Sequence, residues 1–441
     1  MNFLNILESG FSHLPAYTKE GEDEGKIATI MQTVATRLHN NYPYPHPMYA
    51  GQMLKPPHAI AQAAYYLAMH INPNNHALDG GKESSAMEKE AVAGIAKMFG
   101  WNTHLGHLTS GGTMANLEAL WVAGQLAEGK YVVASELAHY THSRISGVLK
   151  LPFRAIPCDS KGKMDIQALE LALQTGEIGT VVVTLGTTGM GTCDDLVGIL
   201  ALKQKYNFRI HIDAAYGGYF ALADNLAEET KQQFEAISQV DSIVIDPHKH
   251  GLQPYGCGCV LFQNPEIGRL YAHDSPYTYF TSDALHLGEI SLECSRAGAA
   301  AVALWATMQL FPLEKKGLFS QRLDASLAAA HTLYQLICKD KHFLPLIPPT
   351  LDIVVWCPKG KSFSEISQLS KSLFHACEQQ HLYLALFQFP AKLIDETLYP
   401  EWKAVEKDAT HIVCLRSCLM KPEHLEWVER IWEVLQNCVN S

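Results

Sequence analysis

Residues 242–262 read SIVIDPHKHGLQPYGCGCVLF and bring a lysine to the end of an apolar run. The run 243–245 predicts a buried strand, which the letters DPH end just before Lys249, and 259–262 predicts another strand. A buried ammonium group loses its hydration, so burial lowers the pKa of a lysine and makes its amine a nucleophile. Lys249 is therefore either a nucleophile that forms a Schiff base with an aldehyde or a strand-end lysine that reaches solvent.

Outward from this stretch, short apolar runs alternate with helical patterns, the first of which cover 84–101 and 112–129. The apolar runs lie at 131–134, 153–156, 180–185, 208–212, 243–245 and 259–262. Strands separated by helices need crossover connections, which are typical of an α/β domain with a mostly parallel sheet covered on both faces.

The segments before and after this domain differ from it in sequence pattern. Residues 1–60 predict an arm with a helix at 26–38, followed by the proline-rich 41–57, NYPYPHPMYAGQMLKPP, which cannot form regular structure. The alanine-rich segment 291–310 predicts a long helix that leads out of the domain.

Beyond that helix the pattern predicts a smaller α/β domain. Its strands are expected at 353–356, 384–389 and 412–415, and its helices at 363–379 and 422–438. The expected division is an arm at 1–60, a large domain at 61–312 and a small C-terminal domain at 313–441.

Composition excludes several classes of protein. The 441 residues are 47% hydrophobic and carry a net charge of −11 without a long basic run, which argues against nucleic-acid or anionic-membrane binding. The N-terminus lacks the features of a secretion signal, and no apolar run reaches the ~18 residues of a membrane span. Eleven cysteines without framework spacing indicate a reducing compartment, so we expect a cytoplasmic protein.

The histidines and cysteines do not predict a metal site. Cys257 and Cys259 are separated by one residue, whereas metal fingers need wider spacing and a second pair. The sequence also lacks a helical i, i+4 histidine pair with an adjoining glutamate.

The segment 108–116, LTSGGTMAN, predicts a glycine pair at the start of a helix. Free backbone N–H groups and the positive end of the helix dipole favour a phosphate there. Gly111 and Gly112 would let the backbone approach the phosphate closely, with Thr113 beside it. The alternative is an ordinary helix cap, in which Ser, Thr and Gly are common.

Two further segments place polar groups at strand ends. In 211–218, HIDAAYGG, Asp213 ends a predicted parallel strand, at the edge of the sheet where ligands bind. A protonated ring nitrogen of a cofactor would offset the cost of burying this acid, and a structural Arg or Lys pair is the alternative. His139, in SELAH at 135–139, follows another strand and is a site residue or a capping or core histidine.

A phosphate loop, a histidine, an aspartate and then a lysine in this order resemble the pyridoxal-phosphate-dependent group II amino-acid decarboxylases. The similarity runs from about residue 40 to the C-terminal helix, and DPHK (246–249) and HIDAAYGG are its most specific segments. Around DPHKHGLQP the chain looks most like the archaeal tyrosine/aspartate decarboxylases. The resemblance implies the aspartate-aminotransferase-like fold type I of pyridoxal-phosphate enzymes, with pyridoxal 5′-phosphate as cofactor.

The resemblance also implies roles for single residues. Lys249 would form the Schiff base with the cofactor, Asp213 would pair with its pyridinium nitrogen, and His139 would stack on its ring. The catalytic positions implied are Lys249, His139, His248 and a loop tyrosine. The cofactor-binding positions implied are Ser110, Gly111, Gly112, Thr113, His139, Thr187, Asp213, Ala215, His248 and Lys249.

Substrate contacts come from other segments in this resemblance. Arg416 in CLRSCLM corresponds to an arginine that meets a substrate carboxylate, a surface arginine being the alternative, and HPMYAGQM (46–53) brings Gln52 and Tyr49. The loop 273–289 would carry the proton donor, Tyr277 or Tyr279, and tyrosines packed under the loop are the alternative. In relatives this loop closes over the partner subunit's site, which implies a homodimer with shared active sites.

The expected activity is α-decarboxylation of an aromatic (tyrosine-like) or acidic L-amino acid to CO₂ and a primary amine. The segment 288–298, GEISLECSRAG, is also similar to sphingosine-phosphate lyase. A carbon–carbon lyase or an aldehyde-forming enzyme on the same scaffold is therefore the alternative.

Overall fold

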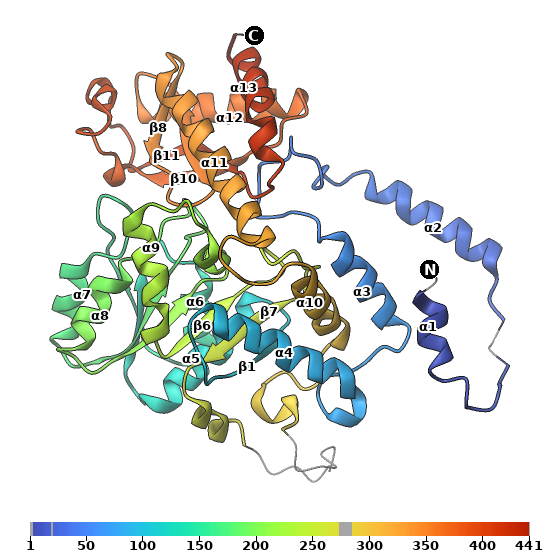
Figure 1. The fold of residues 1–441 in the computed structure, drawn as a ribbon. Helices are drawn as coiled ribbons and strands as arrows, with labels where there is room; N and C mark the ends of the chain where they lie inside the picture. The colour runs from blue at the N-terminus through green and yellow to red at the C-terminus, as the bar shows by residue number, and fades with distance from the viewer. Residues whose placement is uncertain (1–2, 19–20, 273–284, 441) are drawn as a thin grey trace.

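The computed structural model describes residues 3–18, 21–272 and 285–440, and two sheets organise these residues (Figure 1). The larger sheet has seven strands in the order β1-β7-β6-β5-β4-β2-β3. They are β1 (Leu105–Thr109), β2 (Tyr131–Ser135), β3 (Phe153–Ile156), β4 (Ile178–Thr184), β5 (Arg209–Asp213), β6 (Ser242–Ile245) and β7 (Gly258–Phe262). Strands β3, β2, β4, β5 and β6 are parallel, and β7 runs antiparallel to β6 and β1.

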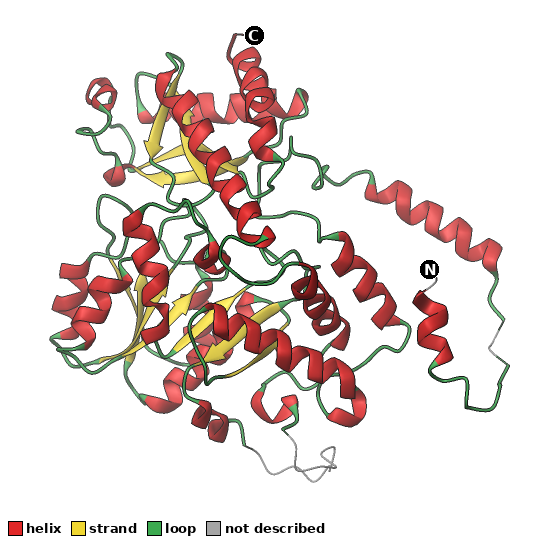
Figure 2. Cartoon of the chain, viewed as in Figure 1, coloured by secondary structure: helices red, strands yellow, loops and turns green. Residues whose placement is uncertain are grey.

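Helices surround this sheet, as Figure 2 shows. They are α3 (Ala59–Met69), α4 (Lys82–Met98), α5 (Gly112–Leu126), α6 (Thr141–Val148), α7 (Ile166–Leu173), α8 (Leu196–Lys203), α9 (Glu228–Glu235) and α10 (Gly298–Leu310). Every residue of β4, IGTVVVT, is buried, as is every residue of β6, SIVI. Continuous apolar runs of this kind are what strands covered on both faces require.

The second sheet has four antiparallel strands in the order β10-β11-β9-β8. They are β8 (Phe343–Ile347), β9 (Ile353–Pro358), β10 (Ala385–Pro390) and β11 (His411–Cys418), with α11 (Leu318–Lys339), α12 (Phe363–Gln379) and α13 (His424–Asn440) beside them. Ser362 caps α12 by accepting a hydrogen bond from the backbone N–H of Glu365. The expected limits at residues 60 and 312 stay predictions.

At the N-terminus, α1 (Phe3–Ser9) and α2 (Glu24–Leu38) extend away from both sheets (Figure 1). Neither helix has a buried residue. Among the described residues, no helix is both long and apolar enough to cross a membrane.

The mostly parallel sheet, the smaller domain and the helices 112–129 and 363–379 are confirmed, with end shifts of a few residues. The expected helix 291–310 is wrong in its first third, because α10 begins only at Gly298. Residues before it bind other elements instead: Arg296 pairs with Glu88, and Glu293 accepts a hydrogen bond from Ser110.

Candidate active site

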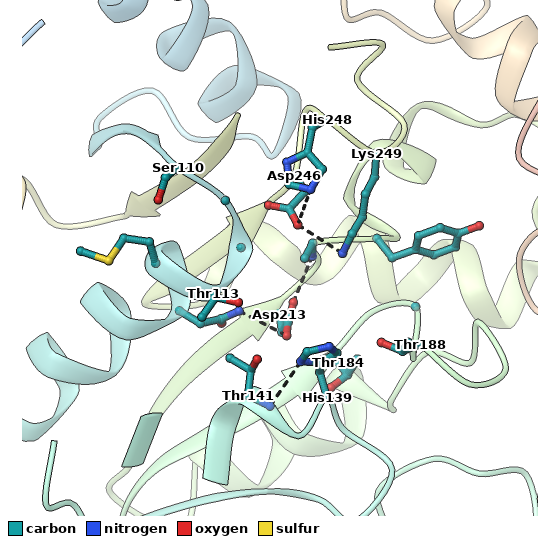
Figure 3. A pocket seen from close by; sticks show the side chains of 17 residues that line it. Ser110, Thr113, His139, Thr141, Thr184, Thr188, Asp213, Asp246, His248 and Lys249 are labelled. Carbon is teal, nitrogen blue, oxygen red and sulfur yellow. Dashed lines mark hydrogen bonds and ion pairs between the residues drawn. The ribbon is translucent and has the colours of Figure 1, made fainter. Parts of the chain in front are cut away.

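A cavity of about 300 Å³ opens at the carboxyl ends of the parallel strands. Thr184 and Asp213, at the ends of β4 and β5, line it, and so does Lys249, which follows β6 (Figure 3). The ends of parallel strands meet at one edge of the sheet, and this is where open α/β sheets bind ligands.

The predicted phosphate loop forms one wall of the cavity. Residues 110–113 follow β1 and enter α5, so the N-terminal N–H groups of a 15-residue helix face the site. Gly111 has φ +152°, which L side chains rarely adopt. A Cβ on Gly112 would lie 2.7 Å from Asp246 Oδ2, so only glycine fits beside this carboxylate.

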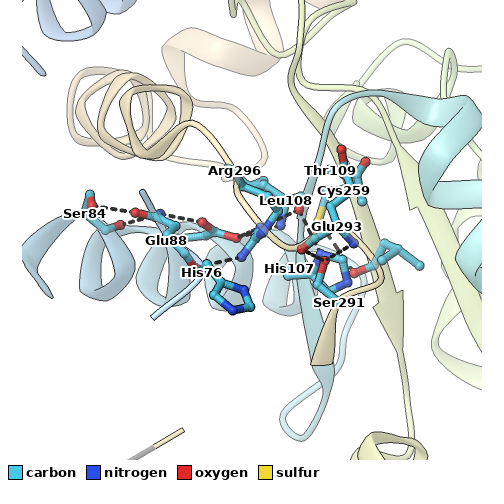
Figure 4. A network of polar contacts seen from close by, with 12 residues as sticks. His76, Ser84, Glu88, His107, Leu108, Thr109, Cys259, Ser291, Glu293 and Arg296 are labelled. Carbon is cyan, nitrogen blue, oxygen red and sulfur yellow. Dashed lines mark hydrogen bonds and ion pairs between the residues drawn. The ribbon is translucent and has the colours of Figure 1, made fainter. Parts of the chain in front are cut away.

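A buried ion pair fixes the backbone just before this loop. Arg296 Nη1 lies 2.6 Å from Glu88 Oε1 and also donates to the carbonyl oxygen of Leu108, while Leu108 N–H donates to Glu88 (Figure 4). Both peptide groups of Leu108 are thereby fixed two residues before Ser110. The backbone N–H of Ser110 donates to Glu293 Oε2 at 2.9 Å.

Lys249 points into the cavity and pairs with Asp246, its Nζ lying 3.2 Å from Oδ2 (Figure 3). Its side chain is 21% exposed, so it is not a surface lysine. Asp246 is buried, and its Oδ1 has no hydrogen-bond partner among the residues that the structure describes. The carboxylate of Asp246 therefore lies between Gly112, at the start of α5, and the amine of Lys249.

His248 lies beside the same carboxylate. Its Nδ1 is 2.8 Å from the carbonyl oxygen of Cys257, which can only accept, so Nδ1 is the donor. Its Nε2 lies 3.6 Å from Asp246 Oδ2. Burial lowers the pKa of His248, and the charge of Asp246 opposes this effect.

Asp213 is a buried carboxylate held by three donors. Its Oδ2 lies 2.8 Å from His142 Nε2 and 3.4 Å from Asn116 Nδ2, and its Oδ1 accepts from the backbone N–H of Ala215 at 3.1 Å. Burial acts to raise the pKa of Asp213, but the hydrogen bond and charge of His142 and the charge of Lys249 outweigh it, and the pKa falls below its ordinary value. The site therefore keeps an anion at the end of β5.

His139 and Ala215 also line the cavity. His139 is partly buried, which lowers its pKa, and its Nδ1 accepts from the backbone N–H of Thr141. Its ring stacks on Tyr140 with centroids 4.5 Å apart.

The remaining sequence-predicted residues lie elsewhere or cannot be placed. Thr187 is buried and bonds Thr192 through the two hydroxyls at 2.7 Å, and its neighbour Thr188 lines the cavity instead. Tyr277 and Tyr279 lie outside the described residues.

Arg416 contacts Thr188, which lines the cavity. Its Nη1 donates to the carbonyl oxygen of Thr188 at 2.9 Å and its Nη2 to Gln52 Oε1 at 2.8 Å. It is 6% exposed, which contradicts the alternative of a surface arginine. Tyr49 OH accepts from the backbone N–H of Gln52 and lines a separate hollow of about 200 Å³.

Sequence reasoning missed Asn116, His142, Thr184, Thr188 and Asp246. Asp246 stands in the DPHK segment, and its nearness to Lys249 was visible there. His142 follows His139 by three residues in the sequence, but its contact with Asp213 depends on how α6 is placed beside the end of β5. No cluster of three or more His, Cys, Asp or Glu side chains in the described ranges could hold a metal ion.

The cavity fits pyridoxal phosphate by the chemistry of its groups. A phosphate needs N–H donors at a helix start with no side chain in the way, as Gly111 and Gly112 provide. An aldehyde needs an amine, and Lys249 faces the cavity; a pyridinium needs a buried anion, and Asp213 is one.

Comparison with known proteins agrees with this site. The pyridoxal-dependent decarboxylase conserved domain matches residues 118–356. An L-tyrosine decarboxylase of Enterococcus faecium is 28% identical over 438 residues, covering 74% of this chain and 71% of the relative. A probable L-tyrosine/L-aspartate decarboxylase of Methanosphaera stadtmanae is 26% identical over 310 residues, covering 69% and 77%.

Solved structures share the fold. Mouse CSAD superposes with a TM-score of 0.79 at 18% identity, covering 98% of this chain and 91% of that one. Oryza sativa TDC with PLP and tryptamine also gives 0.79, at 16% identity and with 99% and 91% coverage. The expected fold type I and cofactor are thereby confirmed, and the chain belongs to the pyridoxal-dependent decarboxylase family, as a pyridoxal-phosphate-dependent amino-acid decarboxylase.

Proposed function

We propose that this decarboxylase acts on an L-amino acid with an aromatic or acidic side chain and releases a primary amine. The observation that carries the proposal is that Lys249, Asp213 and the phosphate loop 110–113 line one cavity. The names of the relatives support the substrate class, since they are called L-tyrosine, L-aspartate or L-tyrosine/L-aspartate decarboxylases.

The residues of the cavity divide the cofactor-binding work. Lys249 Nζ is the amine that would condense with the cofactor aldehyde with loss of water, and Asp246, 3.2 Å away, would orient it. The N–H groups of residues 110–113 would hold the phosphate with His248 beside it, and Asp213 would hold the ring nitrogen. When bound, pyridoxal phosphate supplies the protonated ring that accepts the electron pair left by the departing CO₂.

Other residues act on the substrate and on protons. His139 and Ala215 confine the ring, which orients the substrate bond to be broken. The proton that replaces the carboxylate would come from Tyr277 or Tyr279, or from His248 when its ring is protonated, and Lys249 would then release the product.

In this proposal, the residues that contact the substrate are Arg416, Gln52 and Tyr49. The guanidinium sits one residue behind the cavity wall at Thr188, and its Nε has no hydrogen-bond partner among the described residues. An unused donor on a buried, permanently charged group suits a carboxylate of the substrate.

We also propose that the protein forms a homodimer and that it is located in the cytoplasm. Exposed apolar side chains on α1 and α2 support the dimer, and eleven free cysteines support a reducing compartment. The expected sharing of active sites between subunits belongs to this proposal.

The experiment is a measurement of CO₂ release by the cofactor-loaded protein across the standard L-amino acids, 2,4-diaminobutyrate, DOPA and cysteine sulfinate. We expect one strong signal, from an aromatic or an acidic substrate, with one equivalent of amine. Lys249→Ala is expected to abolish it.

Two outcomes would contradict the proposal. An aldehyde in place of the amine would favour the aldehyde-forming alternative. No CO₂ across the panel, with the cofactor shown to be bound by its visible absorbance, would favour the carbon–carbon lyase.

A further inference from the structure

Asp213 is supported from behind by a histidine that does not reach the cavity. His142 lies on α6 with its side chain 1% exposed, and its Nε2 is 2.8 Å from Asp213 Oδ2. A carboxylate can only accept, so Nε2 is the donor. Nδ1 has no hydrogen-bond partner among the described residues.

A second chain of donors ends on the same carboxylate. Asn116 Nδ2 faces Asp213, so its Oδ1 must accept, and His211 Nε2 lies 2.9 Å from that oxygen. His211 Nε2 is then the donor and Nδ1 the acceptor for the Ser242 hydroxyl at 2.9 Å. Burial lowers the pKa of His211 to about 3, so this ring is neutral and has one N–H to give. Every donor in the chain is directed toward Asp213.

The charged and titratable groups around Asp213 come from several elements. His142 faces it from α6, His211 from β5 through Asn116, and Lys249 and His139 from the cavity. Burial alone would raise the pKa of this carboxyl, and His142 makes the largest opposing contribution. An aspartate kept anionic in this way does not take a proton from a pyridinium, so the proton stays on the ring.

We propose that His142 is a positioning residue, which holds Asp213 as an aimed anion and thereby sets the affinity for the cofactor and the protonation of its ring nitrogen. This inference rests on the proposed pairing of Asp213 with that nitrogen. His142 itself touches neither the cavity nor the substrate.

Three substitutions separate the hydrogen bond from the bulk of the side chain. In His142→Gln the amide nitrogen can take the place of Nε2, in His142→Asn it falls short, and His142→Leu has no donor. A hydrogen bond to a charged group corresponds to about tenfold to hundredfold in binding. We therefore expect His142→Asn and His142→Leu to raise the Kd of pyridoxal phosphate by that factor, and His142→Gln to stay within about threefold of the native protein.

The measurement is an absorbance titration of cofactor-free protein with pyridoxal phosphate, with thermal unfolding as a check on folding. His331→Leu, on α11 and outside the cavity, is the matched histidine control and should leave the Kd unchanged. If His142→Leu does not fold, the Gln and Asn pair decides. Equal Kd values for native protein, Gln and Asn variants would overturn the inference.

A spectroscopic readout tests the protonation of the ring. The ¹⁵N NMR shift of the ring nitrogen, in cofactor labelled at that atom, is followed against pH. Without the donor at position 142 Asp213 is a poorer partner for the pyridinium, so the ring nitrogen should lose its proton at lower pH in His142→Asn than in the native protein. Unchanged titration would count against the role.

Asp213→Asn distinguishes failure of this inference from failure of the proposed function. If Asp213→Asn leaves the Kd and the ¹⁵N titration unchanged, Asp213 does not pair with the ring, and both fail. If Asp213→Asn weakens binding but His142→Asn does not, only the inference fails. In the double variant we expect no further loss beyond Asp213→Asn, because His142 acts through that carboxylate; additive losses would make His142 a structural residue.

Discussion

Gly112 leaves room for Asp246 where the phosphate loop enters α5. A Cβ at this position would lie 2.7 Å from Oδ2 and 3.0 Å from Oδ1 of that buried carboxylate. Gly112→Ala should displace Asp246 from its 3.2 Å contact with Lys249 and move the N–H groups that face the phosphate. We expect the Kd of pyridoxal phosphate to rise about tenfold or more, which corresponds to about 1.4 kcal/mol.

The control for this substitution is Gly147→Ala, near the end of α6. An added Cβ there meets nothing within 4 Å, and alanine is the better helix former. This variant should bind the cofactor like the native protein and be equally or more stable. An unchanged Kd in Gly112→Ala would show that Asp246 can shift without disturbing the site.

Single residues of the site could be predicted where their type and place in a motif suffice. Lys249 and Asp213 stand at strand ends, where burial gives an amine or a carboxylate a reason to be there. His142 could not be predicted, because its partner is 71 residues away and the contact exists only once α6, packed on α5 and β3, brings this side chain to the end of β5. Thr187 and Thr188 are adjacent, and the direction of the turn after β4 decides which one lines the cavity.

Among the elements, α2 carries an apolar face that none of the described residues of its own chain covers. Ile27, Ile30, Met31, Val34 and Leu38 are 41–60% exposed, and their spacing puts them on one side of the helix. If a second copy covers this face, Ile30→Glu with Val34→Glu should place charges in the interface and dissociate the dimer. We expect the mass measured by light scattering to fall from two chains to one.

The matched control uses the opposite face of α2. Gln32→Glu with Thr36→Glu adds the same charge at the same spacing, and both positions are exposed. This variant should remain a dimer. If both double variants keep the mass of two chains, α2 is not the dimer contact, and a native protein with the mass of one chain would contradict the homodimer itself.

Elements were predictable where hydrophobic period and length agree, as in β6 and α12. Strand β1, LGHLT, was missed because a glycine and a histidine interrupt its apolar pattern, yet His107 is buried by bonding Glu118 at 3.0 Å. The alanine-rich segment before α10 favours a helix by composition. Its ion pair and hydrogen bonds to α4 and the phosphate loop prevail over that propensity.

At the scale of the whole molecule, the smaller domain reaches the wall of the active site. Tyr216 lines the cavity, and its hydroxyl lies 2.6 Å from Asp352, just before β9. Asp352 Oδ2 is also 3.2 Å from His250 Nε2, next to Lys249 in sequence. Sequence indicated two domains but not this contact, because it joins residues 136 positions apart.

Lys55 lies buried in the same region and makes the stability of the protein depend on pH. Burial lowers its pKa from 10.5 to about 7, helped by Arg322 and opposed by Asp352, and its Nζ donates to the carbonyl oxygen of Met420 at 3.3 Å. Between pH 7 and about 10 the unfolded chain holds a proton that the folded chain has lost, so stability rises with pH across this window.

Lys55→Met removes this proton and keeps most of the volume. We expect chemical unfolding at pH 7, 8, 9 and 10 to show the native protein gaining about 1 kcal/mol per pH unit relative to Lys55→Met. The control is Lys97→Met on the exposed side of α4, which loses little hydration on folding and should parallel the native protein. Parallel curves for Lys55→Met and the native protein would mean that Lys55 stays charged when folded, and that Asp352 compensates for its burial.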